Sequence, residues 1–385
     1  MINLPITLPT QRYYRIGVST FFFIQGLTFA SWASRIPDIK NKLQLSDGAL
    51  GGVLFSLPAG QLTAMALSGY LVSKYGSKLM LSIAAFLYPA ILVLLGSVES
   101  TWQLTAGLFV FGIFGNLSNI AVNTQGVGVE RLYGRSIMAS FHGLWSLAGF
   151  TGGLISFLIA GYLPPFTHFM IIYGICFLLL ISARNIILPR DPYKGSGGNN
   201  KLFVKPDRYI VILGLIAFAC MICEGTMFDW SGIYFENIVK VPASLTRLGY
   251  VAFMCTMAGG RFAADHFVTK YGVDRILKLS GISIFSGMML SVLFPDIISA
   301  TLGFLLVGLG VSSVVPMVYS LAGKSKKMLP GVALATVSSI SFLGFLIGPP
   351  IIGFIAQLSS LRWSFALIAL LGMGTTLLSG KVRPQ

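Results

Sequence analysis

One carboxyl group in the sequence lies in the middle of a long apolar run. Glu224 is about fifteen residues into the run 209–235. A charge at that depth in a lipid bilayer is costly, so such a residue normally has a function or a partner. Burial favours the neutral acid, and a carboxyl group whose protonation depends on water access can couple a proton to a conformational change. The adjacent Gly225 would also permit a local helix break. The alternative is a permanently neutral Glu224 that is hydrogen-bonded to a neighbouring helix.

Side-chain amides form a second candidate set. Asn116, Asn119 and Asn123 recur at i, i+3 and i+7, which places them in one stripe of a predicted helix. Carboxamides both donate and accept hydrogen bonds, so the stripe suits a neutral, hydroxylated solute. Hydrogen bonding between helices is the alternative for these three residues. Gln25, deep in the first apolar run, is a further candidate ligand.

Aromatic and ionisable side chains complete the predicted site. Trp32 and Trp230 occupy corresponding places in the two halves of the chain. They could stack on a sugar ring, or they could be anchors at the membrane boundary. His142 could titrate near neutral pH if buried, and so act as a proton partner or a solute ligand. Asp229 is a second candidate for proton coupling, with a structural ion pair as the alternative.

No sequence pattern supports an enzyme. The motifs H-E-x-x-H, G-x-S-x-G and G-x-x-x-x-G-K-[ST] are absent from the 385 residues. The three histidines are far apart in the sequence, and Cys220 and Cys223 have no second ligand pair nearby. We therefore expect no metal site and no cofactor. Without a phosphate-binding loop, ATP is not expected to be the energy source.

The composition indicates a chain that lies almost wholly in a membrane. Hydrophobic residues make up 55% of it and charged residues 10%, whereas soluble domains carry about 25% charge. Each spanning helix needs roughly 20 apolar residues. Apolar runs between charged, proline or glycine breaks predict twelve such helices, at 13–35, 48–72, 79–98, 102–126, 135–163, 167–188, 209–235, 246–269, 275–294, 297–322, 330–358 and 361–380.

The basic residues predict the orientation of these helices. Of the 27 lysines and arginines, 21 fall on the side that carries both termini. The six on the other side are Arg35, Lys40, Lys42, Lys240, Arg247 and Arg362. Basic residues concentrate on the cytoplasmic side of bacterial membranes, so both termini are expected in the cytoplasm and the protein in the inner membrane. The same distribution accounts for the net charge of +15 without a nucleic-acid partner.

The two halves of the chain are related by an internal repeat. At an offset of 196 residues, VSKYG at 72–76 matches VTKYG at 268–272, and glycines 107, 112 and 152 match glycines 303, 308 and 348. The repeat predicts an N-terminal six-helix bundle at 1–188, a polar, glycine-rich cytoplasmic linker at 189–208 and a C-terminal six-helix bundle at 209–385. Two such halves are what an alternating-access transporter requires.

The stretch 69–78 reads GYLVSKYGSK. It resembles the loop signature Gly-x-Leu-x-Asp-Arg-x-Gly-Arg-Arg of the major facilitator superfamily, with Ser73 at the acidic position. The resemblance implies a cytoplasmic latch formed by Gly69, Lys74 and Gly76. In the second half it implies a latch with Arg261 and Asp265.

Three further segments are similar to the bacterial rhizopine-transport (MosC-like) branch near the fucose permeases: WASRIP at 32–37, EGTMFDWS at 224–231 and GPP at 348–350. The expected fold is therefore an all-α membrane protein of twelve transmembrane helices in two pseudo-symmetric bundles. The expected function is secondary active transport of a small polar solute such as a sugar or a sugar-like compound, with coupling to protons as one energy source that the residues allow. The alternatives are a proton-coupled exporter of drugs or amphiphiles and a membrane sensor that binds its solute without transporting it. Besides the solute and protons, membrane lipid is the expected partner, and the chain is expected to be a monomer.

Overall fold

The computed structural model describes residues 8–134, 137–191, 207–325, 328 and 330–382, except the side chains of residues 8–10, 265, 330 and 331. Most of the predicted linker, both chain ends and residues 135–136 of the fifth predicted span lie outside these ranges. Within them the chain forms α-helices, one 3-10 turn and no strand. The helices are α1 Leu8–Ala33, α2 Ile36–Lys42, α3 Asp47–Leu54, α4 Ser56–Tyr75, α5 Ser77–Gly96, α6 Thr101–Tyr133, α7 Met138–Ile159, α8 Pro165–Ala183, α9 Arg208–Asn237, η1 Ala243–Leu245, α10 Leu248–Tyr271, α11 Val273–Leu293, α12 Ile297–Gly323, α13 Pro330–Leu358 and α14 Leu361–Ser379.

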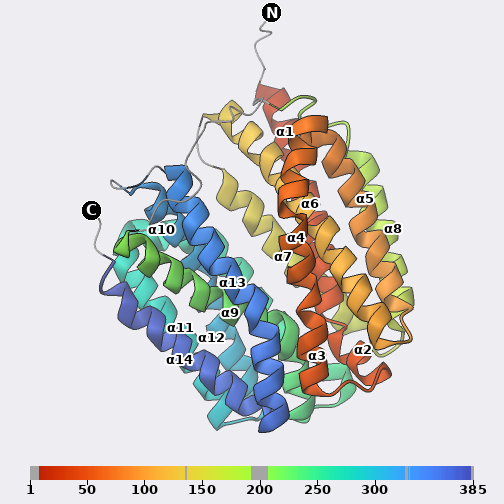
Figure 1. Cartoon of the computed structure of the whole chain (residues 1–385), viewed down its shortest axis with the longest axis vertical. Coiled ribbons are helices and arrows are strands. Elements are labelled where there is room, and N and C mark those ends of the chain that lie inside the picture. Colours follow the sequence, from red (N-terminus) through yellow and green to blue (C-terminus); the bar gives the residue numbers. More distant parts are fainter. Residues whose placement is uncertain (1–7, 135–136, 192–206, 326–327, 329, 383–385) are drawn as a thin grey trace, which may run out of the picture. The chain divides into compact units, whose positions relative to one another are not determined.

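The contacts divide the chain into two compact units. Unit 1 comprises Met1–Trp32 and Ser56–Gly198, and unit 2 comprises Ala33–Phe55 and Asn199–Gln385. In unit 1, α6 packs against α4 and α5, and α5 packs against α8. In unit 2, α9 packs against α12, α13 and α14, while α11 packs against α12 and α14 (Figure 1). Each unit is thus a bundle of long helices with its own core.

Eleven helical stretches in the described residues are long and apolar enough to cross a membrane, by length and composition alone. They include every predicted span except 246–269. That span is helical, as α10, but its second half carries Arg261, Asp265 and Lys270 and is too polar to meet the same standard. Spanning helices satisfy their backbone hydrogen bonds internally, which is why apolar runs of this length fold as helices in lipid.

A pair of glycine contacts confirms the internal repeat at atomic detail. A Cβ on Gly112 of α6 would lie 2.1 Å from the carbonyl oxygen of Leu57 on α4. A Cβ on Gly308 of α12 would lie 2.2 Å from the carbonyl oxygen of Phe253 on α10. Leu57 and Phe253 are themselves related by the offset of 196 residues. The same close helix crossing, which only glycine allows, therefore occurs once in each unit.

Residues 33–55, the α2–α3 segment, lie between α1 and α4 in sequence but pack within unit 2. Helix α3 lies against α13, and α2 contacts α9. The contact with α13 is close, because a Cβ on Gly51 would lie 2.7 Å from the carbonyl oxygen of Pro349. In addition, the backbone N–H of Gly48 donates to Oε1 of Gln357 at 3.1 Å. The segment is therefore built into unit 2, although its sequence position falls within the predicted N-terminal bundle.

Candidate functional site

Glu224 and Arg261 form an ion pair inside unit 2. Glu224 is on α9 and Arg261 is on α10, and Nη2 of Arg261 donates to Oε1 of Glu224 at 3.1 Å. Only 6% of the Glu224 side chain and 14% of the Arg261 side chain are exposed. A guanidinium group remains charged at any working pH. Each charge therefore offsets part of the desolvation cost of the other, and removal of either would leave an uncompensated buried charge.

The sequence pattern predicts a cytoplasmic latch at Arg261 and indicates no charged partner for Glu224. A signal for their pairing is nevertheless present once the helix ends are known. Glu224 lies thirteen residues before the end of α9 at Asn237, and Arg261 lies thirteen residues after the start of α10 at Leu248. Two consecutive antiparallel helices place such residues at equal depth. The sequence predicts that the first of these helices ends at residue 235 and that the second begins at residue 246. With those ends Glu224 and Arg261 would lie at unequal depths, so the predicted spans do not indicate the pair.

Aromatic rings line the same stretch of α9. Phe228, one turn beyond Glu224, has its ring centroid 5.7 Å from that of Phe253 and 6.2 Å from that of Phe345. Helix α9 continues through Gly225, so the local break that this glycine would permit is not present. The ion pair thus lies on a continuous helix near apolar rings, where a low dielectric strengthens charge interactions.

In unit 1, the structure brings Gln25 to the helix that carries the asparagine stripe. Nε2 of Gln25 donates to the carbonyl oxygen of Gly115 on α6 at 3.5 Å. The neighbouring Asn116 is 9% exposed, and its Oδ1 has no hydrogen-bond partner among the described residues. Asn119 is exposed and Asn123 half-buried, and Nδ2 of Asn123 donates to Oδ1 of Asn119 at 2.7 Å. One buried acceptor is therefore left for a water or a solute.

The other predicted ligands are in different surroundings. His142 on α7 is exposed rather than buried, and its ring lies edge-on to Phe22 of α1 with centroids 5.3 Å apart. Trp32 in unit 1 and Trp230 in unit 2 are 1% and 0% exposed, and neither indole N–H has a partner among the described residues. An anchor at the lipid boundary needs an exposed ring, so this burial argues against the anchor alternative. Stacking of the two rings on a sugar stays a prediction. Asp229 is half-buried and has no ion pair within the described part of the chain.

The turn between α4 and α5, where a latch is predicted, contacts an acidic residue from outside the loop signature, Asp191. Gly76, with φ +89°, forms the turn between α4 and α5. The carboxylate of Asp191 accepts from the backbone N–H of Ser77 at 2.7 Å and also from its hydroxyl group. Lys74 places its ammonium group 5.2 Å from the ring centroid of Tyr75. A carboxylate at a helix N-terminus is electrostatically favourable, so Asp191 places a negative charge at the start of α5.

The other residues predicted for the latch are Gly69 in unit 1 and Asp265 in unit 2. Gly69 is half-buried on α4, with open space where a Cβ would be. The side chain of Asp265 lies outside the described residues. In unit 2, Gly272 has φ +82° and occupies the place of Gly76, so the turn itself is repeated.

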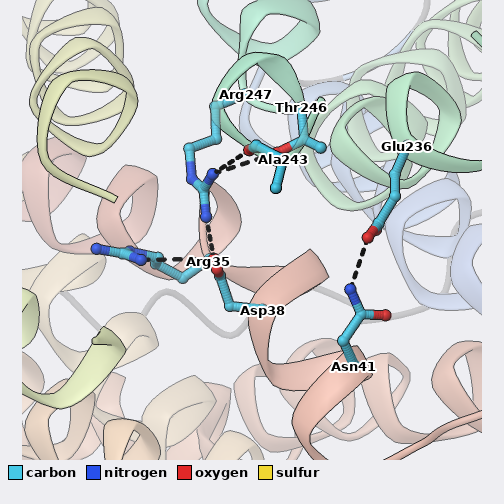
Figure 2. Close-up of polar contacts among 7 residues, drawn as sticks. All are labelled: Arg35, Asp38, Asn41, Glu236, Ala243, Thr246 and Arg247. Atoms are coloured by element: carbon cyan, nitrogen blue, oxygen red, sulfur yellow. Dashed lines mark hydrogen bonds and ion pairs between the residues drawn. The ribbon is translucent and has the colours of Figure 1, made fainter. Parts of the chain in front are cut away.

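A polar cluster that the sequence did not suggest holds the α2–α3 segment in unit 2 (Figure 2). The carboxylate of Asp38 on α2 accepts a hydrogen bond from Arg247, just before α10, and lies 3.6 Å from Nη1 of Arg35. Arg247 also donates to the carbonyl oxygen of Ala243 at 3.0 Å. Arg35 and Arg247 are only 1% and 3% exposed. Two buried guanidinium groups therefore share one carboxylate.

A second contact lies beside this cluster. Nδ2 of Asn41 donates to Oε1 of Glu236 at 2.6 Å, which joins the end of α2 to the end of α9 (Figure 2). The sequence offered no signal for either contact, because the partners are about 200 residues apart in the chain and come from segments of unrelated pattern.

Comparisons with known proteins agree on one family. A family model described as Major Facilitator Superfamily matches residues 18–330. An MFS-type transporter of Yersinia pestis, itself uncharacterised, is 34% identical over 360 residues, which cover 93% of this chain and 92% of the relative. Membrane protein MosC of Rhizobium meliloti is 30% identical over 371 residues, which cover 95% of this chain and 89% of the relative.

Solved structures share the fold at low sequence identity. A mutant of the nucleoside transporter NupG superposes with a TM-score of 0.78 at 12% identity, over 96% of this chain and 99% of that one. A bacterial homologue of the human lysosomal transporter Spinster gives a TM-score of 0.69 at 12% identity, over 98% and 97% of the two chains. At this level of identity the likeness concerns the arrangement of helices alone.

Proposed function

Because the chain belongs to the major facilitator superfamily, we propose that it is a secondary active transporter that moves a small polar solute across the bacterial inner membrane by alternating access. The proposed solute is a sugar or a sugar-like compound. The observation that carries the proposal is the buried ion pair of Glu224 and Arg261. Ionisable residues inside a membrane bundle are rare and costly, and they mark solute or proton pathways.

The polar groups of unit 1 support a hydroxylated solute. The free acceptor of Asn116 and the amide of Gln25 lie on neighbouring helices. Hydroxyl groups donate as well as accept, so they can satisfy a buried carbonyl oxygen that would otherwise remain unpaired. A purely apolar compound would leave that acceptor without a partner, and this favours a solute with hydrogen-bond donors such as hydroxyl groups.

The ion pair provides a physical route to proton coupling. Protonation of Glu224 removes its charge and releases the Arg261 guanidinium, whose donors then become available to solute oxygens. Loss of the proton restores the pair and competes with the solute for those donors. Coupling of this kind makes proton binding and solute binding mutually favourable.

Counterflow in proteoliposomes tests transport itself. Purified protein is reconstituted with an unlabelled solute inside, and entry of the same labelled solute is followed for a panel of hexoses, cyclic polyols and nucleosides. We expect transient accumulation of at least one member of the panel. A protein that binds a panel member, seen as a rise in its melting temperature, but shows no counterflow would be a sensor rather than a transporter.

Glu224→Gln tests the coupling role. With an imposed pH gradient, we expect the variant to lose concentrative uptake while it retains counterflow. Glu99→Gln is the matched control, because Glu99 is exposed in the connection between α5 and α6. Gradient-driven accumulation that continues unchanged in Glu224→Gln would show that the proton site is elsewhere.

A further inference from the structure

A groove lies between α5 and α8 at one end of unit 1. It is lined by the turn between α4 and α5, by one face of α5 as far as Leu87, and by residues from the end of α8 and the turn that follows it. It has a volume of about 750 Å³. This is the size range of pockets that hold small organic ligands. The groove lies wholly within unit 1, and none of the residues assigned to the solute lines it.

One part of the groove is cationic. Its basic rim consists of Lys78, Arg184 and Arg190. Lys78 is half-buried, and the two arginines are exposed. The structure records no ion pair for any of the three within the described residues. The one carboxylate in the groove, Asp191, is already bound to the N-terminus of α5 through Ser77. The rim therefore carries three positive charges against the single carboxylate of Asp191, and the groove keeps an excess of positive charge.

The other part of the groove is apolar. Its apolar floor consists of Phe86, Phe177 and Ile181, all of which are exposed. The rings of Phe86 and Phe177 lie edge-on with centroids 6.2 Å apart. These residues belong to helices that are long and apolar enough to cross a membrane, so in a bilayer this exposed apolar floor would face hydrocarbon. A cationic rim above an apolar floor matches an amphiphile with a negative head and a hydrocarbon tail.

We infer that this groove binds an anionic phospholipid, with its phosphate on the basic rim and an acyl chain along the apolar floor. Basic pockets between transmembrane helices recognise anionic headgroups in this way. The distribution of basic residues assigns this end of unit 1 to the cytoplasmic leaflet, where positively charged side chains concentrate. The bound lipid would fasten α5 to α8 and to the turn that Asp191 holds, and so stabilise unit 1.

Lipid binding to the purified full-length chain tests the inference. Native mass spectrometry and thermal unfolding are measured with phosphatidylglycerol and, separately, with phosphatidylcholine of the same acyl chains. The test variant carries Lys78→Gln, Arg184→Gln and Arg190→Gln. The control carries Arg275→Gln, Lys278→Gln and Lys381→Gln, which remove the same charge from exposed positions of unit 2.

We expect phosphatidylglycerol to raise the melting temperature of the wild type and of the control by roughly 3 °C more than phosphatidylcholine does. In the test variant that difference should vanish. Its affinity for phosphatidylglycerol should fall by roughly 100-fold, or about fivefold for each basic residue. Equal losses in the test variant and the control would overturn the inference, since they would show a general charge effect. Inorganic phosphate that reproduces the full stabilisation would also overturn it, because the site would then hold a free ion and not a lipid.

Discussion

Asp38 accepts a hydrogen bond from Arg247, a residue 209 positions further along the chain. This contact joins the α2–α3 segment to the start of α10, and the buried Arg35 lies against the same carboxylate. A conformational change that moves the segment away from the rest of unit 2 has to break this cluster. Any such step must therefore supply water or new partners to two arginines that the structure keeps out of solvent.

Replacement of Asp38 by Asn should loosen the α2–α3 segment. The substitution keeps the size of the side chain but leaves Arg35 and Arg247 without their shared carboxylate. We expect faster amide hydrogen exchange over residues 36–54, with exchange in α11 and α14 unchanged, because local opening follows the loss of local contacts. Glu99→Gln serves as the control. Unchanged exchange in the segment would mean that the packing of α3 on α13 holds it without the ion pairs.

The Glu224–Arg261 pair should show strong coupling in a double-mutant cycle. Arg261→Gln alone should lower stability in detergent by about 3–5 kcal/mol, because it leaves a buried carboxylate unpaired. The double variant with Glu224→Gln should recover much of that loss, since two neutral amides can hydrogen-bond to each other. Thermal unfolding of the four proteins measures the coupling energy. Additive losses would show that the two side chains do not depend on each other.

The glycine crossings should tolerate no side chain. Gly112→Ala and Gly308→Ala each place a Cβ about 2 Å from a backbone carbonyl oxygen, so the helices must move apart. We expect each variant to lower the yield of folded protein and the melting temperature markedly. Gly259→Ala on α10 is the control, because open space surrounds its Cβ position and alanine favours a helix by up to about 1 kcal/mol. A melting temperature for Gly112→Ala equal to that of the control would contradict the close crossing.

Asp296 should make stability depend on acid pH. Its side chain accepts hydrogen bonds from the backbone N–H groups of Ile298 and Ser299 at the start of α12, and these bonds hold its pKa below the ordinary value of 3.8. The folded state therefore binds the proton less tightly than the unfolded state. The stabilisation is fully present above pH 3.8 and is lost as the pH falls through the lower folded pKa.

The variant Asp296→Asn, which keeps an acceptor but cannot titrate, isolates this effect. Melting temperatures of the wild type and the variant, measured from pH 6 down to the limit of solubility, should converge as the wild-type carboxylate becomes protonated. A constant difference between the two curves across this range would show that the titration of Asp296 does not contribute.

Much of the fold could be predicted from local sequence. A lipid-spanning helix needs only a sufficient run of apolar residues, so eleven of the predicted spans match helices of spanning length. The internal repeat could also be recognised from local sequence, because its most visible matches are glycines with local backbone or packing requirements. Turn glycines such as Gly76 and Gly272 need φ values that other residues rarely adopt, and crossing glycines such as Gly112 and Gly308 have no room for a Cβ.

The candidate site was only partly predictable. A buried charge such as Glu224 is conspicuous in an apolar run, whatever its surroundings. Its partner Arg261 could not be predicted in the same way, because the two residues lie on different helices and meet only when those helices pack at the right height. His142 lies in an apolar run and is nevertheless exposed, which the run alone did not predict. Its role as a proton partner or solute ligand stays a prediction.

The sequence by itself predicted the eleven described helices of spanning length, the repetition of the helical unit and an ionisable residue deep in α9. These properties depend on the burial preference of each residue and on short-range backbone geometry. Only the tertiary structure decided that Arg261 pairs with Glu224, that Asp191 caps the N-terminus of α5, and that the α2–α3 segment belongs to unit 2. Such pairings join residues far apart in the chain, and their energies depend on distance and burial in the folded molecule, which no local pattern records.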